Sequence, residues 1–120
     1  MADSLLASWL PAFLLTQVIE APVVVAATRR HDPAVDVGRA LVASFVATGL
    51  SHPLLWFGWT RVVSDYGAFV FSGELLVVGL EAVVIALVAH PMRLGRALLV
   101  SLAANATSLV VGSALRLLGL

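Results

Sequence analysis

The stretch Phe69–Ala89, FVFSGELLVVGLEAVVIALVA, decides which folds are open to this chain. It is long and apolar enough to cross a bilayer as a helix, which takes about 20 mostly apolar residues. It also contains Glu74 and Glu81, and a charged side chain near the centre of a spanning helix costs on the order of 2.5 to 3.5 kcal/mol. The spacing of these two acids is close to two helical turns, so both leave the same side of the helix. That side cannot face lipid, and other helices must cover it.

The composition places the rest of the chain in the membrane as well. Its 120 residues are 61% hydrophobic and 12% charged, whereas soluble domains carry about 25% charged residues. The net charge of zero gives no indication of a nucleic-acid partner. The lack of cysteine excludes disulfides, thiolate metal sites and iron–sulfur clusters. We therefore expect an all-α integral membrane protein that contacts the lipid bilayer, in the cytoplasmic membrane of a bacterium or an archaeon.

Four apolar spans follow one another with short links between them. No link is long enough for a second domain, so we expect residues 1–120 to form a single transmembrane domain, a bundle of four transmembrane helices. Asp32 followed by Pro33 resembles the start of the second helix, with Asp32 as the N-cap. The four spans cover approximately residues 5–27, 40–56, 69–89 and 94–118.

The positions of the arginines predict the orientation. Arginine and lysine accumulate in cytoplasmic links, and five of the seven basic residues flank the link 28–39 or the link 90–96, whereas Arg61 and Arg116 lie on the opposite side. Both links are therefore predicted to be cytoplasmic, with both termini outside. The five residues are Arg29, Arg30, Arg39, Arg93 and Arg96.

An internal repeat relates the two halves of the chain. GRALVASFVAT, residues 38–48, resembles GRALLVSLAAN, residues 95–105, and six of the eleven positions are identical. Chance similarity in a chain rich in Ala, Leu and Val is the alternative explanation. The repeat predicts two helical hairpins, 5–57 and 69–118, in the same orientation and related by a pseudo-twofold axis along the membrane normal.

The repeat makes Glu20 the counterpart of Glu81, because Glu20-Ala21 matches Glu81-Ala82. At the helical rise, Glu20 lies about 10 Å and Glu81 about 12 Å from the cytoplasmic ends of their spans. Two carboxylates that share an apolar site repel each other and resist ionisation. We therefore expect that one of them holds a proton, or that a cation or an arginine side chain lies between them, and Glu20 and Glu81 are the ligands we would assign to any metal ion. A bound cation is the one cofactor that the sequence suggests.

Hydroxyl and amide side chains at similar depth complete the predicted polar site. Such side chains often serve only to pack membrane helices together, and this alternative applies to all of them. His52 and Glu74 form a second level nearer the outside, and the alternative there is a single structural His–Glu hydrogen bond. The residues assigned to an ion-binding site or proton relay are Gln17, Glu20, Ser44, Thr48, His52, Glu74, Glu81, Ser101 and Asn105.

Prolines lie close to two of these residues. Pro22 removes the helical hydrogen bond to the Val18 carbonyl near Glu20, and Pro53 removes that to Gly49 near His52. Freed carbonyls of this kind bind cations or ordered water in transporters.

In its length and its four spans the chain resembles the small multidrug resistance transporters and the fluoride channels, and Glu20 resembles the membrane glutamate of the former. Those proteins assemble as antiparallel pairs, whereas the repeat and the arginine bias of this chain indicate one orientation. The sequence contains no serine-hydrolase, metalloprotease or phosphate-loop motif.

Three functions are compatible with these features. The first is proton- or cation-coupled transport or conduction of a small ion or solute, which we expect. The second is a non-catalytic subunit of a larger membrane complex. A homo-oligomer is compatible with either function. The third is an intramembrane enzyme that uses the glutamates and His52.

Overall fold

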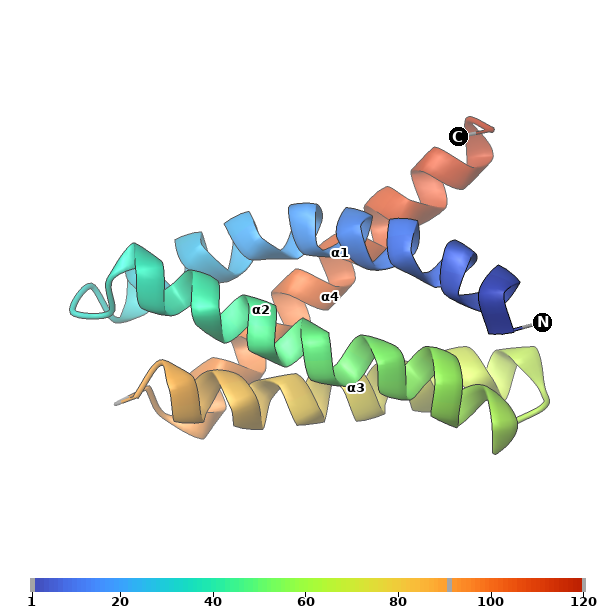
Figure 1. The fold of residues 1–120 in the computed structure, drawn as a ribbon. Coiled ribbons are helices and arrows are strands. Elements are labelled where there is room, and N and C mark those ends of the chain that lie inside the picture. The colour runs from blue at the N-terminus through green and yellow to red at the C-terminus, as the bar shows by residue number, and fades with distance from the viewer. Residues whose placement is uncertain (1, 91, 120) are drawn as a thin grey trace.

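The computed structural model describes residues 2–90 and 92–119, which form four long helices (Figure 1). Each is long and apolar enough to cross a membrane, as the sequence predicts. Two short helical turns, η1 (Leu54–Gly58) and η2 (Trp59–Arg61), extend the second helix, and no strand is present in the described ranges. The four helices are α1 (Ala2–His31), α2 (Val37–Pro53), α3 (Tyr66–Val88) and α4 (Leu94–Leu117).

The helices form a ring in which each packs against its neighbours in the sequence and α4 closes back on α1. Neighbouring helices run in opposite directions (Figure 1). Because each helix packs on two neighbours in the ring, α1 lies diagonally across from α3, and α2 from α4. The end of the bundle that contains Val35 and Met92 is called the closed end here. The opposite end, which contains η1, η2 and both termini, is called the open end (Figure 1).

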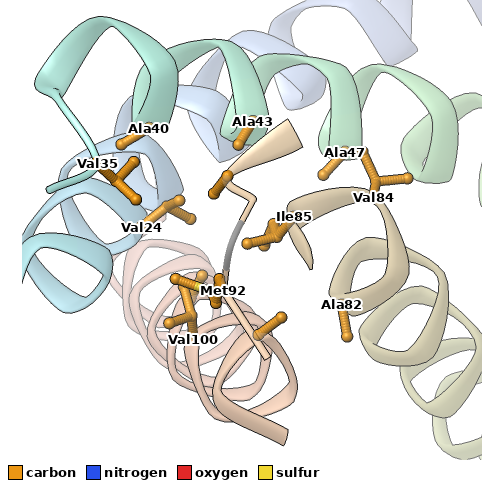
Figure 2. Packing of buried hydrophobic residues seen from close by; sticks show 13 residues of the cluster. Val24, Val35, Ala40, Ala43, Ala47, Ala82, Val84, Ile85, Met92 and Val100 are labelled. Atoms are coloured by element: carbon orange, nitrogen blue, oxygen red, sulfur yellow. The ribbon is translucent and has the colours of Figure 1, made fainter. Parts of the chain in front are cut away.

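A tight apolar core fills the closed end. Alanines of α2 and α4 let the helix backbones approach closely, and Val24, Ile85 and Val100 point into the space between them (Figure 2). Apolar side chains therefore fill the space between the helices at the closed end. The buried members of the core are Val24, Val35, Ala40, Ala43, Ala47, Ala82, Val84, Ile85, Ala89, Met92, Ala97, Val100 and Ala104.

Two arginines form hydrogen bonds across the bundle at the closed end. Arg39 of α2 donates from Nη1 to the His90 carbonyl oxygen, 2.7 Å away, just after α3. Arg96 of α4 donates from Nη1 to the carbonyl oxygen of His31, the last residue of α1, at 3.1 Å. Arg96 also forms an ion pair with Asp32 at 3.3 Å. Each arginine therefore joins one helical hairpin to the other.

The start of α2 differs from the sequence prediction. Asp36, not Asp32, is the N-cap, and its carboxylate accepts a hydrogen bond from the Arg39 backbone N–H at 2.7 Å. The Val35 N–H bonds back to the Asp32 carbonyl at 3.0 Å, so Pro33 lies in a turn that precedes the helix. The Asp32 side chain pairs with Arg96 instead of capping α2.

Pro22 lies within α1 without interrupting it, and Pro53 is the last residue of α2, which continues into η1. Pro22 is exposed within α1, as is Val18, whereas Glu20 is buried on the other side of the helix. The carbonyl that Pro22 frees therefore belongs to a lipid-facing position and not to the polar site. After Pro53 the backbone widens into the π-helical turn η1, in which the Trp59 N–H bonds to the Leu54 carbonyl.

Candidate functional site

A cavity of about 410 Å³ lies among the four helices in the open half of the bundle. Its floor, next to the closed-end core, is formed by Glu20, Ser51, Glu81 and Asn105. Its outermost lining residues include Arg116 in the last turn of α4 and Tyr66 at the start of α3, and both are exposed. The cavity is therefore accessible from the open end and closed at the other by apolar packing.

Glu20 enters the floor from α1 and is almost fully buried, with 2% of its surface exposed. Thr48 of α2 donates from Oγ1 to Glu20 Oε2 at 3.1 Å. Ser108 of α4 lies next to the same carboxylate. Helices on both sides of α1 therefore contribute polar groups to Glu20.

Glu81 enters the floor from α3, diagonally across the bundle, and is also 2% exposed. Ser51 of α2 donates from Oγ to Glu81 Oε1 at 2.6 Å, and Asn105 of α4 donates from Nδ2 to Oε2 at 3.1 Å. Both oxygens of this carboxylate therefore have a neutral hydrogen-bond donor. Hydroxyl and amide groups stabilise negative charge only in part, because they carry no charge themselves.

The two carboxylates have no cationic side chain against them. They interact electrostatically with each other, and Glu74 contributes to the same negative field. Within residues 2–90 and 92–119 the one ion pair is Arg96–Asp32, at the closed end. No cationic side chain of the described residues is thus placed to compensate negative charge at the floor.

Three of the predicted site residues lie below the cavity and join helices. Gln17 donates from Nε2 to Ser44 Oγ at 3.1 Å, which links α1 to α2. Ser101 donates from Oγ to the Val78 carbonyl at 2.9 Å, which links α4 to α3. None of the three lines the cavity, so their contacts match the packing alternative. Thr48 does not line the cavity either, but it contacts Glu20 directly.

His52 lies higher on the cavity wall, within a group of aromatic rings. Its Nε2 lies 3.4 Å from Thr16 Oγ1, and its ring stacks on that of Trp56 with 6.0 Å between centroids. Phe13 and Trp9 of α1 lie at 5.7 and 6.2 Å. The hydrogen-bond partner of His52 is therefore Thr16 and not Glu74, which the alternative from the sequence had paired with it.

Glu74 is half-buried on the same cavity, about two turns outward from Glu81 on α3. The residue before it, Gly73, lets η1 and η2 approach α3 closely, because a Cβ there would lie 2.7 Å from Leu55 Cδ1. Trp59 secures the same contact by donating from Nε1 to Ser72 Oγ at 3.1 Å. The wide turn after Pro53 thus places Leu55 and Trp56 on the cavity wall.

Sequence reasoning did not assign Ser51, Thr16, Trp56 and Arg116 to the site. Ser51 carried a signal, because the repeat pairs it with Ser108, but its direct contact with Glu81 depends on the rotation of α2 relative to α3. Trp56 lies in the π-helical turn after Pro53 and lines the cavity.

The donor set limits the kind of ion that the floor suits. In the part of the chain that the structure describes, no three His, Cys, Asp or Glu side chains come together as a metal site. The available donors at the floor are carboxylate, hydroxyl and amide oxygens. Such oxygens suit protons and hard cations better than soft transition metals.

Comparisons with protein-family models, with curated proteins and with solved structures found no match to this chain.

Proposed function

We propose that this chain transports or conducts a small ion or solute across the membrane, coupled to protons or cations that bind between Glu20 and Glu81. One observation carries the proposal: two buried carboxylates, without a cationic partner among the described residues, line the floor of a cavity in the open half of the bundle. The apolar core beyond the floor is the barrier that such a protein needs on its other side.

The energetics of the floor explain why an ion or a proton is required. Two like charges in a medium of low dielectric repel strongly, and neither is stabilised by bulk water. A shared proton removes one of the charges, and a cation between the carboxylates neutralises them directly. Protons and cations therefore compete for the same pair, and this competition is the simplest means of coupling their movements.

The repeat and its pseudo-twofold axis belong to the same proposal, and several contacts support them. Residues that the repeat treats as counterparts make corresponding contacts: Thr48–Glu20 corresponds to Asn105–Glu81. At the closed end, Arg39 binds the His90 carbonyl as Arg96 binds that of His31. An axis between the hairpins 5–57 and 69–118 would pass through the floor between the two glutamates.

The arginine distribution supports a cytoplasmic closed end and an outward-facing cavity. Arg39 and Arg96, together with the exposed Arg29, Arg30 and Arg93, surround the closed end. In this orientation both termini lie outside, and ions reach the carboxylates from the extracytoplasmic side.

Flux measurements in proteoliposomes test the proposal. The parent should move protons or alkali cations down an imposed gradient, and Glu20→Gln and Glu81→Gln should each abolish this flux, because an amide has no carboxyl proton to exchange and no negative charge to hold a cation. Asp36→Asn is the matched control: it also replaces a carboxylate by an amide, lies outside the cavity, and keeps a good N-cap for α2. A parent without flux, or Gln variants that conduct like the parent, would favour a non-catalytic membrane subunit.

A further inference from the structure

The outer part of the cavity differs from its floor in symmetry. The floor residues Glu20 and Glu81 correspond to each other in the repeat, whereas the charged residues farther out do not. Glu74 corresponds to Phe13, and Arg116 corresponds to Trp59. The two halves of the chain therefore contribute matching residues to the floor and different residues to the outer walls. We expect this difference if the floor binds the coupling ion and the outer walls bind another molecule.

Glu74 and Arg116 have opposite charges and line the same space without pairing. Glu74 lies about 10 Å outward of Glu81 along α3, and Arg116 lies about 16 Å outward of Asn105 along α4. Helical side chains lean toward the N-terminus of their helix, which points Glu74 outward and Arg116 inward. Both line the cavity, yet the two side chains form no ion pair. The cavity that both side chains line therefore offers two opposite charges to a bound molecule.

The size and the walls of the cavity favour an occupant larger than an ion. A water molecule takes about 30 Å³ of liquid volume, and small-molecule sites measure about 300 to 1,000 Å³. The cavity, at about 410 Å³, is in the second range. Trp56, Phe69 and Leu109 contribute apolar surface to its wall, which favours an occupant with an apolar part.

We propose, building on the transport function above, that the outer half of the cavity binds a zwitterion with an apolar portion. Its ammonium group would lie against Glu74, its carboxylate or phosphate group against Arg116, and its apolar portion on Trp56 and Phe69. A simple organic cation would be repelled by Arg116 at the entrance, and a simple anion by the three glutamates beyond it. A zwitterion satisfies both charges.

Binding to the purified parent protein tests the charge requirement with three probes that share a phenylethyl skeleton. These are phenylalanine, phenethylamine, which lacks the carboxylate, and 3-phenylpropionate, which lacks the amine. Phenylalanine should bind about tenfold or more tightly than either analogue, because each missing charge removes one charge-assisted hydrogen bond. Equal binding of phenethylamine and phenylalanine would overturn the proposal.

Variants assign the two charges to residues. Glu74→Gln should weaken phenylalanine binding about tenfold, and Arg116→Gln should do so while removing the preference for phenylalanine over phenethylamine. Arg61→Gln is the control, since Arg61 is an exposed arginine at the same end that does not line the cavity. Loss of binding in Arg61→Gln to the same extent would contradict the assignment.

A zwitterionic phospholipid headgroup carries the same chemistry and is the second source of ligand. The parent should then retain phosphatidylethanolamine in preference to phosphatidylglycerol on transfer from mixed lipid to detergent, measured by native mass spectrometry. If retention of phosphatidylethanolamine depends on both Glu74 and Arg116, and phenylalanine does not bind, the lipid headgroup is the ligand. If neither probe depends on both residues, the proposal is wrong.

The experiments distinguish a failure of the proposed transport function from a failure of the proposed zwitterion site. Glu20→Gln and Glu81→Gln alter only the floor, so phenylalanine or lipid binding should persist in these variants while proton or cation flux is lost. Absence of flux in the parent with intact zwitterion binding would overturn the transport function alone. Flux that depends on the floor glutamates, with no zwitterion bound, would overturn this inference alone.

Discussion

At the scale of single residues, the burial of Glu20 and Glu81 sets the chemistry of the molecule. The sequence predicted this pair, because each glutamate occurs in an apolar span at a matching position of the repeat. The structure adds the partners: Thr48 contacts Glu20, while Ser51 and Asn105 contact Glu81. Ser51 could not be assigned from spacing, because its side chain points to α3 and its neighbours Thr48 and His52 point to α1.

The first prediction concerns the stability of the floor. Replacing Glu20 or Glu81 by Gln removes one of two repelling charges and preserves the shape and hydrogen-bonding capacity of the side chain. Both variants should therefore be at least as stable as the parent at neutral pH, measured as Tm in detergent. Glu74→Gln should have a smaller effect, because Glu74 is only half-buried.

The pH dependence provides the control for this prediction. A proton relieves the repulsion only in the folded state, so the parent should lose stability as the pH rises and the pair becomes fully charged. The Gln variants should show a flatter dependence. Gln variants that unfold readily at every pH would show that the carboxylates are structural.

At the scale of the elements, the apolar pattern predicted all four helices but not the geometry after Pro53. Periodicity indicates that a segment is helical, and a proline shows where a hydrogen bond is lost. Whether the helix then ends, bends or widens depends on its neighbours. Here Leu55 packs against α3 at Gly73, and the π-helical turn η1 places Leu55 at that position. The sequence pattern did not identify Asp36 as the N-cap of α2 for a similar reason. The turn at Asp32–Val35, which precedes the helix, depends on contacts that the apolar pattern does not indicate.

The second prediction tests this packing. Gly73→Ala places a Cβ 2.7 Å from Leu55 Cδ1, so Leu55 or η1 must shift, at a cost of about 1 to 3 kcal/mol. Gly79→Ala, in the same helix, meets nothing within 4 Å and should be neutral or slightly stabilising. The measurement is the thermal stability of the two variants side by side. Equal behaviour would show that η1 does not pack tightly on α3.

At the scale of the whole molecule, the bundle is closed at one end and open at the other. The sequence predicted the number of spans, and the correspondence between the two halves stays a prediction. It gave no indication that Arg39 and Arg96 bind carbonyls across the bundle, because such contacts join residues far apart in the sequence. It also could not show the cavity, which depends on how far the helices diverge.

The third prediction concerns topology. Because the chain has no cysteine, single cysteines at the exposed positions Ala34 and Ser64 report their own accessibility. In intact cells, Ser64→Cys should react with a membrane-impermeant maleimide, and Ala34→Cys should react only after the membrane is permeabilised. The reverse pattern would place the closed end outside.

Infrared difference spectroscopy tests the central claim most directly, because it observes the carboxyl groups themselves. Spectra of the purified protein would be recorded with and without an alkali or alkaline-earth cation at neutral pH. If Glu20 and Glu81 share a proton that the cation displaces, cation addition should remove a protonated-carboxyl C=O band, and the change should vanish in both Gln variants but persist in Asp36→Asn. A spectrum that is unaffected by every such cation, or a band that persists in the Glu20→Gln Glu81→Gln double variant, would contradict the account.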